Sequence, residues 1–124
     1  VGSTAALAAM EILSAPGVYD QLHRIGARLR SGIEDAGRRY GLPVQALGED
    51  MVFGVRFMEN SHPTSWVDLL ENDKTMGAQF AAECVKRGIL TIPNEKFYIS
   101  VAHTEADIDQ TLEVIDEALK AIAR

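Results

Sequence analysis

The polar side chains best suited to chemistry lie in one short stretch, residues 94–103. It contains Asn94, Glu95, Ser100 and His103. A histidine can serve as an acid or a base, because it is the side chain that titrates nearest to neutral pH. His103 stands between a β-forming run and the expected start of a helix. That position favours a structural hydrogen bond over direct participation in a reaction.

The other reactive residue types favour structural roles. Cys84 lies on the apolar face of an expected helix, where a cysteine is more often a small buried hydrophobe than a nucleophile. His23 and His62 have no partners at metal-ligand spacing, so no metal site is predicted. The pair Glu49 and Asp50 favours a solvated turn over a catalytic pair of carboxylates.

Hydrophobic periodicity and turn residues predict the elements that hold these side chains. Helices are expected over residues 3–14, 18–40, 74–87 and 105–123, strands over 44–47, 51–58, 89–92 and 97–102, and a short helical turn over 66–71. Asp73 and Thr104 are the expected N-caps of the last two helices.

Two patterns indicate how these elements pack. The last helix carries an apolar seam, which we expect to be buried against the sheet; it consists of Ile108, Leu112, Ile115, Leu119 and Ile122. Gly26, Gly32 and Gly37 interrupt the long second helix, although glycine disfavours a helix interior by up to about 1 kcal/mol relative to alanine. These glycines indicate close contact between that helix and the sheet.

The order of elements predicts an α+β fold in a single domain, residues 1–124. Short strands need helices on at least one face, so we expect a two-layer sandwich. Its sheet should have three or four strands, mixed or mainly antiparallel, and should be covered by helices. The helix between the second and third expected strands would form a βαβ-like step.

Composition limits the possible partners. The net charge is -6, with 18 acidic and 12 basic residues, and a nucleic-acid surface needs clustered positive charge. No apolar run approaches the roughly 20 residues that cross a bilayer, so no membrane is expected. A single cysteine and no recognisable signal peptide favour the cytoplasm. The first residue, Val1, already lies in a helix-like run, as expected for a piece of a longer protein.

Residues 98–109, Tyr-Ile-Ser-Val-Ala-His-Thr-Glu-Ala-Asp-Ile-Asp, resemble the C-terminal end of class III PLP-dependent aminotransferases. The similarity is greatest to the glutamate-1-semialdehyde 2,1-aminomutase branch. Further segments match in the same order: residues 8–13, 16–19, the glycine-led strand 48–57, and the helix–strand–proline segment from Phe80 to Pro93. Together they cover nearly the whole chain.

The resemblance implies that this chain is the C-terminal small domain of a fold-type I PLP enzyme. The lysine that forms the Schiff base with pyridoxal phosphate (PLP) and most phosphate contacts would lie in the large domain, outside the chain. PLP would therefore be the cofactor of the parent enzyme and would not be held by this chain alone. The expected partners are that large domain, a homodimer mate and a small amino-acid-like substrate.

The same resemblance suggests which residues would face a substrate. Glu95 corresponds to a glutamate of the aminomutase branch, and Asn94 and Ser100 are the weaker candidates. No catalytic, cofactor-binding or metal-binding residue is expected in the chain itself. Class III transaminases carry an arginine near this strand that grips a substrate carboxylate, whereas residues 94–100 contain only Lys96, a point charge without the planar fork of arginine.

A stand-alone module for ligand sensing or oligomerisation is the alternative, because a small α+β sandwich does not by itself determine function. The upstream coding sequence distinguishes the two. A long upstream region with a strand-ending lysine favours the enzyme domain, and a start codon just before Val1 favours the module.

Overall fold

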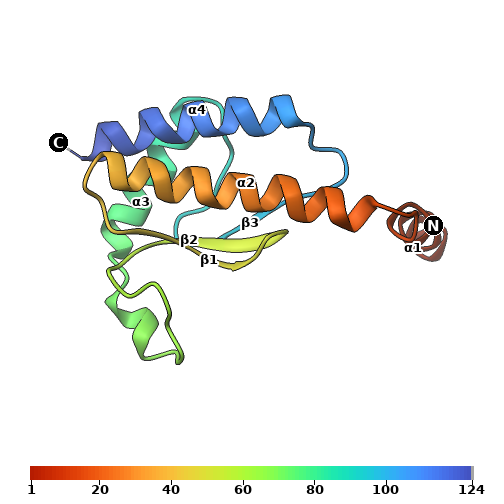
Figure 1. Cartoon of the computed structure of the whole chain (residues 1–124), viewed down its shortest axis with the longest axis horizontal. Helices are drawn as coiled ribbons and strands as arrows, with labels where there is room; N and C mark the ends of the chain where they lie inside the picture. The colour runs from red at the N-terminus through yellow and green to blue at the C-terminus, as the bar shows by residue number, and fades with distance from the viewer. Residues whose placement is uncertain (124) are drawn as a thin grey trace.

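The computed structural model describes residues 1–123 and forms two layers, helices over a small sheet (Figure 1). In chain order the elements are α1 (Gly2–Leu13), α2 (Val18–Arg39), β1 (Val44–Glu49), β2 (Val52–Phe57), the short 3-10 helix η1 (Asp68–Glu71), α3 (Lys74–Lys86), β3 (Lys96–Tyr98) and α4 (Glu105–Ile122). The α+β class and the helix-covered antiparallel sheet are confirmed.

The sheet has three antiparallel strands in the order β1-β2-β3. Val44 faces Phe57 at one end of the β1–β2 pair, and Glu49 faces Val52 at the other. On the other side of β2, Phe53 pairs with Phe97 of β3. The helix α3 connects β2 and β3, as the expected βαβ-like step requires. These two strands are antiparallel neighbours, whereas the strands of a true βαβ unit are parallel.

The predicted strand 89–92 is wrong, and the predicted strand 97–102 is shortened to Lys96–Tyr98. Ile89 N donates to Cys84 O at 3.0 Å and so continues the end of α3. Ile99 N still donates to Met51 O at 2.9 Å, and Ser100 N donates to the His103 ring. Residues 100–103 then form a turn, in which His103 N donates to Ser100 O at 3.1 Å, and the strand ends.

The core lies between the helices and one face of the sheet. Phe53, Val55 and Phe57 alternate along β2 and are buried on this face. Phe53 stacks on Phe97 with ring centroids 5.5 Å apart, and Phe57 meets Phe80 of α3 edge-on at 5.7 Å.

The apolar seam of α4 is inside, as predicted. Ile108, Ile115 and Leu119 are buried, whereas Leu112 and Ile122 are partly buried. The backbone of α4 lies beside α2 and α3, and Figure 1 shows α4 on the far side of α2 from the strands. The seam shares one buried core with Phe53, Val55 and Phe57 of β2, so its predicted burial is confirmed, and α2 and α3 are its nearest backbone neighbours.

Two of the three glycines in α2 explain how closely the helix approaches the hairpin. A Cβ on Gly26 would lie 2.0 Å from Asp50 O, and one on Gly37 would lie 2.6 Å from Val44 Cβ. Gly32 instead faces α4, where an added Cβ would lie 2.5 Å from Leu112 Cδ2. The prediction of helix–sheet contact is thus confirmed at Gly26 and Gly37, and Gly32 marks a helix–helix contact.

The β1–β2 turn is also held to α2 by charge. Arg30 donates to Asp50 Oδ1 at 2.8 Å, and His23 Nδ1 lies 3.1 Å from Asp50 Oδ2. Burial alone would raise the pKa of Asp50, but the bonds with His23 and Arg30 outweigh it and hold the pKa below its usual value. Glu49 is exposed, as a solvated turn predicts, whereas Asp50 is anchored to the helix.

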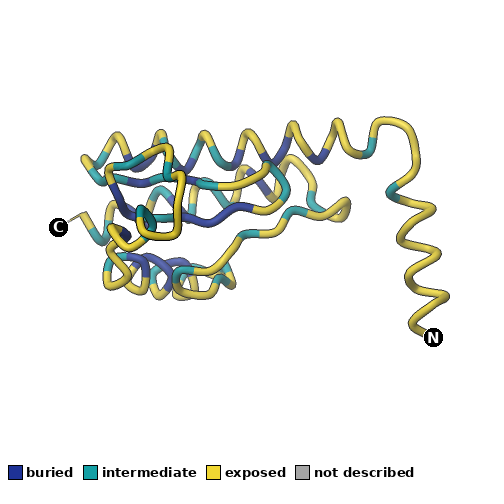
Figure 2. The backbone as a smooth tube through the Cα atoms, turned by 90° about the horizontal axis from the view of Figure 1, so that it is seen from below, coloured by how far each residue is buried: buried dark blue, intermediate teal, exposed yellow. Residues whose placement is uncertain are grey.

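Helix α1 projects away from the rest of the molecule (Figures 1 and 2) and has no buried residue. Leu7, Met10 and Ile12 are each more than half exposed. Within residues 1–123, no helix is long and apolar enough to cross a membrane.

Replacing Gly26 with alanine should destabilise the protein by about 1–3 kcal/mol, the range for overpacking, because the new methyl group would collide with the backbone at Asp50. Gly2→Ala is the matched control, since nothing lies within 4 Å of an added Cβ at Gly2. Urea unfolding followed by circular dichroism measures both variants. Equal midpoints for the two variants would contradict the close contact.

Candidate functional site

Asn94, a predicted substrate-facing residue, holds the loop before β3 in place. It has φ 58°, the one non-glycine residue in 1–123 with a left-handed backbone, and asparagine tolerates this region better than most residues. Its Nδ2 donates to Lys74 O at 3.1 Å, and its Oδ1 accepts from Asn72 Nδ2 at 3.2 Å. The loop is therefore tied to the start of α3.

Asn72 extends this network to β2 and was not predicted from the sequence. It is 9% exposed, and its Oδ1 accepts from Phe57 N at 2.8 Å. The amides of Asn72 and Asn94 thus connect β2, α3 and the loop before β3. The one signal in the sequence is the position of Asn72, directly before the N-cap Asp73, which receives a bond from Met76 N as expected.

Glu95 differs from its neighbour, because its side chain is exposed and makes no hydrogen bond or ion pair with the rest of residues 1–123. Asn94 and Glu95 line one small hollow together with Gly77 and Phe80, with a volume of about 10 Å³. A single water needs about this much space, so the hollow alone is no substrate pocket. Glu95 remains free to reach outward from the chain.

Ser100 lies beyond the other end of β3 and does not join Asn94 and Glu95. Its N donates to His103 Nδ1 at 2.9 Å, and its Oγ accepts from Ala102 N at 3.3 Å. Since Nδ1 accepts a bond, the neutral His103 ring carries its proton on Nε2. The structural role predicted for His103 is confirmed, and Ser100 shares it.

The turn formed by Ser100 and His103 leads into a capped helix. Thr104 and Asp107 form a capping box at the start of α4, which confirms the predicted cap. Bonds from the Thr104 backbone and side chain hold the pKa of Asp107 below its usual value. Ser100 also borders a hollow of about 330 Å³ that lies between Val101 and Ile12 of α1.

The largest hollow along the candidate stretch occupies the place of the predicted strand pair. A cleft of about 520 Å³ separates residues 88–92 from residues 96–99. Apolar side chains line most of it, and Lys96, Tyr98, His103 and Thr111 add polar groups. Sequence reasoning missed this cleft because it predicted two strands at the same place.

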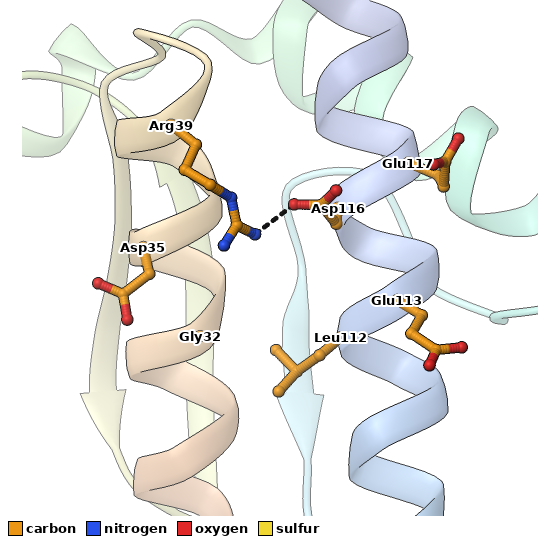
Figure 3. Close-up of a pocket in the computed structure, with 7 residues that line it drawn as sticks. All are labelled: Gly32, Asp35, Arg39, Leu112, Glu113, Asp116 and Glu117. Carbon is orange, nitrogen blue, oxygen red and sulfur yellow. Dashed lines mark hydrogen bonds and ion pairs between the residues drawn. The ribbon is translucent and has the colours of Figure 1, made fainter.

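A second groove, of about 610 Å³, runs between α2 and α4 (Figure 3). Leu112 points toward Gly32, and Arg39 crosses the groove to pair with Asp116, which also accepts from Tyr40 Oη at 2.7 Å. Burial would raise the pKa of Asp116, but these two partners outweigh it and lower the pKa. With Asp116 engaged in these bonds, the carboxylate that lies between α2 and α4 serves to hold the two helices together.

The lysines of this chain do not fit a Schiff-base site. Lys74, Lys86, Lys96 and Lys120 are all exposed, and Lys86 donates to Glu83 Oε1 at 2.6 Å. A lysine that forms a Schiff base needs a lowered pKa, usually from burial or a cationic neighbour. A PLP site would therefore need residues from outside the chain.

Cys84 should resist thiol reagents in the folded protein. It is fully buried, and burial raises its pKa to about 12, whereas the thiolate is the nucleophile. Ellman's reagent should react at a rate limited by unfolding and react at once in denaturant. Rapid labelling of the native protein would contradict the buried position.

Asn94→Ala should destabilise the protein by about 3–4 kcal/mol, from roughly 1–2 for the left-handed backbone and about 1 for each of the two lost amide bonds. Asn94→Gly allows the same left-handed backbone but removes the side-chain bonds. Its stability should lie between that of Asn94→Ala and that of the parent protein. The control is Glu95→Ala, which removes an exposed side chain and should change little. Chemical unfolding measures all three, and equal stability of Asn94→Ala and Glu95→Ala would refute the anchoring role.

Comparison with solved structures shows which proteins share this fold. No family model matches the chain. The FumI protein of Sphingopyxis sp. MTA144, solved in its PLP internal aldimine form, superposes with a TM-score of 0.74 and 28% identity over 90% of this chain and 24% of that protein. An omega-transaminase from Sphaerobacter thermophilus gives a TM-score of 0.74 at 22% identity, over 91% of this chain and 26% of the transaminase, and shows the shared fold alone.

Sequence comparison identifies more particular relatives. A glutamate-1-semialdehyde 2,1-aminomutase from Laribacter hongkongensis is 33% identical over 126 residues, which cover 100% of this chain and 29% of the aminomutase. The aminomutase from Thermomicrobium roseum is 34% identical over 97% of this chain and 28% of its own length. The predicted resemblance to the class III aminotransferases, on the aminomutase side, is therefore confirmed. The chain spans between a quarter and a third of the length of the curated relatives it matches.

Proposed function

We propose that this chain is the C-terminal small domain of a class III PLP-dependent aminotransferase or aminomutase. In this role it covers one side of the cofactor cleft and shapes the access of a small amino-acid-like substrate. The observation that carries the proposal is the alignment of the whole chain with 29% of an aminomutase. A domain that aligns from end to end with a fraction of an enzyme is expected to work as part of one.

The exposed apolar surface of α1 supports this assignment. Leu7, Met10 and Ile12 are exposed on a helix that has no buried residue. Exposed apolar groups gathered on one element commonly mark a contact surface. A large domain and a homodimer mate are the proposed partners, and the cytoplasm is the proposed location.

Within this proposal, the cofactor supplies the amino-transfer chemistry and this chain supplies shape and positioning. Asn94 fixes the loop, and the unrestrained carboxylate of Glu95 faces the substrate. Ser100 sets the turn that ends β3. Because residues 89–100 contain no arginine, this edge offers no bidentate grip on a substrate carboxylate, which suits an amino aldehyde or an amine.

Borohydride trapping tests whether PLP is bound by a lysine outside this chain. The full-length protein and this chain alone are each mixed with PLP, dialysed, reduced and digested for mass spectrometry. The full-length protein should carry one PLP on a lysine outside this chain, and the chain alone should carry no stoichiometric adduct, because its four lysines are exposed. A single stoichiometric adduct on Lys74, Lys86, Lys96 or Lys120 would overturn the proposal.

The coding sequence provides the second arm of the test. An open reading frame that continues far upstream and encodes the trapped lysine agrees with the proposal. A start codon directly before Val1, with no PLP bound, would favour the stand-alone ligand-sensing or oligomerisation module.

A further inference from the structure

The sheet has one face that no helix covers. Figure 1 shows α2 and α4 on the side of the sheet that carries the core, and on the other side only the segment with the short helix η1 extends below one end of the sheet. Side chains alternate along a strand, so the partners of Phe53, Val55 and Phe57 on the opposite face are Val52, Gly54 and Arg56. Cross-strand register adds Leu47 of β1 and Lys96 and Tyr98 of β3.

Arg56 lies on this uncovered face, with its guanidinium folded over Gly54. A Cβ on Gly54 would lie 2.9 Å from Arg56 Cζ, so the absence of a side chain there makes room for the group. Its NH1 donates to Val55 O at 3.1 Å. The guanidinium is therefore partly buried against its own strand, and other donors remain available.

Arg56 differs from every other arginine within residues 1–123. Each of the others forms an ion pair with a carboxylate of this chain: Arg24, Arg28, Arg30, Arg38, Arg39 and Arg87. Arg56 has no carboxylate partner in the described part of the chain, and the same holds for Lys96. Since Lys96 pairs with Gly54, the two cations are diagonal neighbours, at about 7–8 Å between backbones.

Apolar and aromatic groups flank this pair of cations. Val52 is 38% exposed and Tyr98 is 66% exposed on neighbouring strands. The segment of residues 59–73, green in Figure 1, projects past the sheet on this same side and carries Trp66, which is 75% exposed. Arginine and aromatic side chains are enriched at interface centres.

We infer that this uncovered face docks on the part of the same polypeptide that lies outside this chain, and that Arg56 and Lys96 receive a carboxylate from it. The inference rests on the proposed function and names the contact by which the domain is held. The relatives extend well beyond the length of this chain, which covers 28–29% of them. That leaves ample polypeptide to cover the face.

Charge favours this occupant over a second copy of the chain. Arg56 and Lys96 make the centre of the face cationic. Glu49 lies at a corner opposite Val52, and the other acids on this side, Glu59, Asp68, Glu71 and Asp73, belong to the projecting segment 59–73. Two copies packed face to face would bring like charges together, which disfavours association. A carboxylate bound by the guanidinium and the ammonium forms charge-assisted hydrogen bonds, the strong kind.

Arginine labelling of the full-length protein tests the inference. Phenylglyoxal modification of each arginine is followed by mass spectrometry in native buffer and in denaturant, and each native rate is divided by its denatured rate. Arg56 should be labelled at least about tenfold more slowly than Arg38, as expected for a group desolvated in an interface. Arg38 is the matched control, because 68% of its side chain is exposed although it too forms an ion pair.

Carbodiimide cross-linking identifies the partner. It should join the Lys96 amine to a carboxylate outside this chain, and the Lys96→Gln variant should lose that link. Mixing light and heavy nitrogen-labelled subunits distinguishes the source, because a link within one polypeptide never combines the two isotopes.

A mixed-isotope link would overturn the inference in favour of a second copy. Equal labelling of Arg56 and Arg38 with no link at Lys96 would overturn it in favour of a solvated face. Neither result touches the proposed function, which the borohydride trapping and the upstream coding sequence test separately.

Discussion

The close approach of α2 to the β1–β2 hairpin is the constraint on which the rest of the fold depends. Gly26 and Gly37 remove the side chains that would hold helix and hairpin apart. On the same helix, Arg30 donates to Ala46 O and Glu34 accepts from Ala46 N at 2.9 Å. An open sheet edge exposes unpaired backbone groups, so one helix both packs on the sheet and protects its outer edge.

The position of β2 then determines the candidate site. The end of β2 binds Asn72 through Phe57 N, Asn72 binds Asn94, and Asn94 binds the first turn of α3. This chain of amides fixes the backbone next to Glu95 without restraining the Glu95 side chain. A rigid frame beside a free carboxylate is the arrangement expected of a group that must meet a ligand from elsewhere.

Helices and the fold class were predictable because a period of 3.6 residues persists through long segments, and the bounds of α2, α3 and α4 agree with prediction to within about a turn. Residues 89–92 have strand-like composition but no partner strand, since pairing depends on contacts distant in sequence. The left-handed backbone of Asn94 goes with contacts to Asn72 and Lys74, which are distant in sequence, and the bond from Ser100 N to His103 is a local turn contact that strand-like composition conceals. The candidate residues could therefore be named from the sequence, but the contacts of Asn94 and Ser100 and their separation along β3 could not be predicted.

The separation of Asn94 and Glu95 from Ser100 along β3 indicates what kind of partner could contact all three residues. Asn94 and Glu95 lie before β3 and Ser100 lies after it, and within residues 1–123 they border two separate hollows. Only a surface that spans the length of β3 could touch both ends. The uncovered sheet face, with Lys96 and Tyr98 of β3 upon it, lies along that path. A second body docked there would contact the strand from end to end, and the free carboxylate of Glu95 would then lie at the margin of an interface, where a cleft between two domains forms.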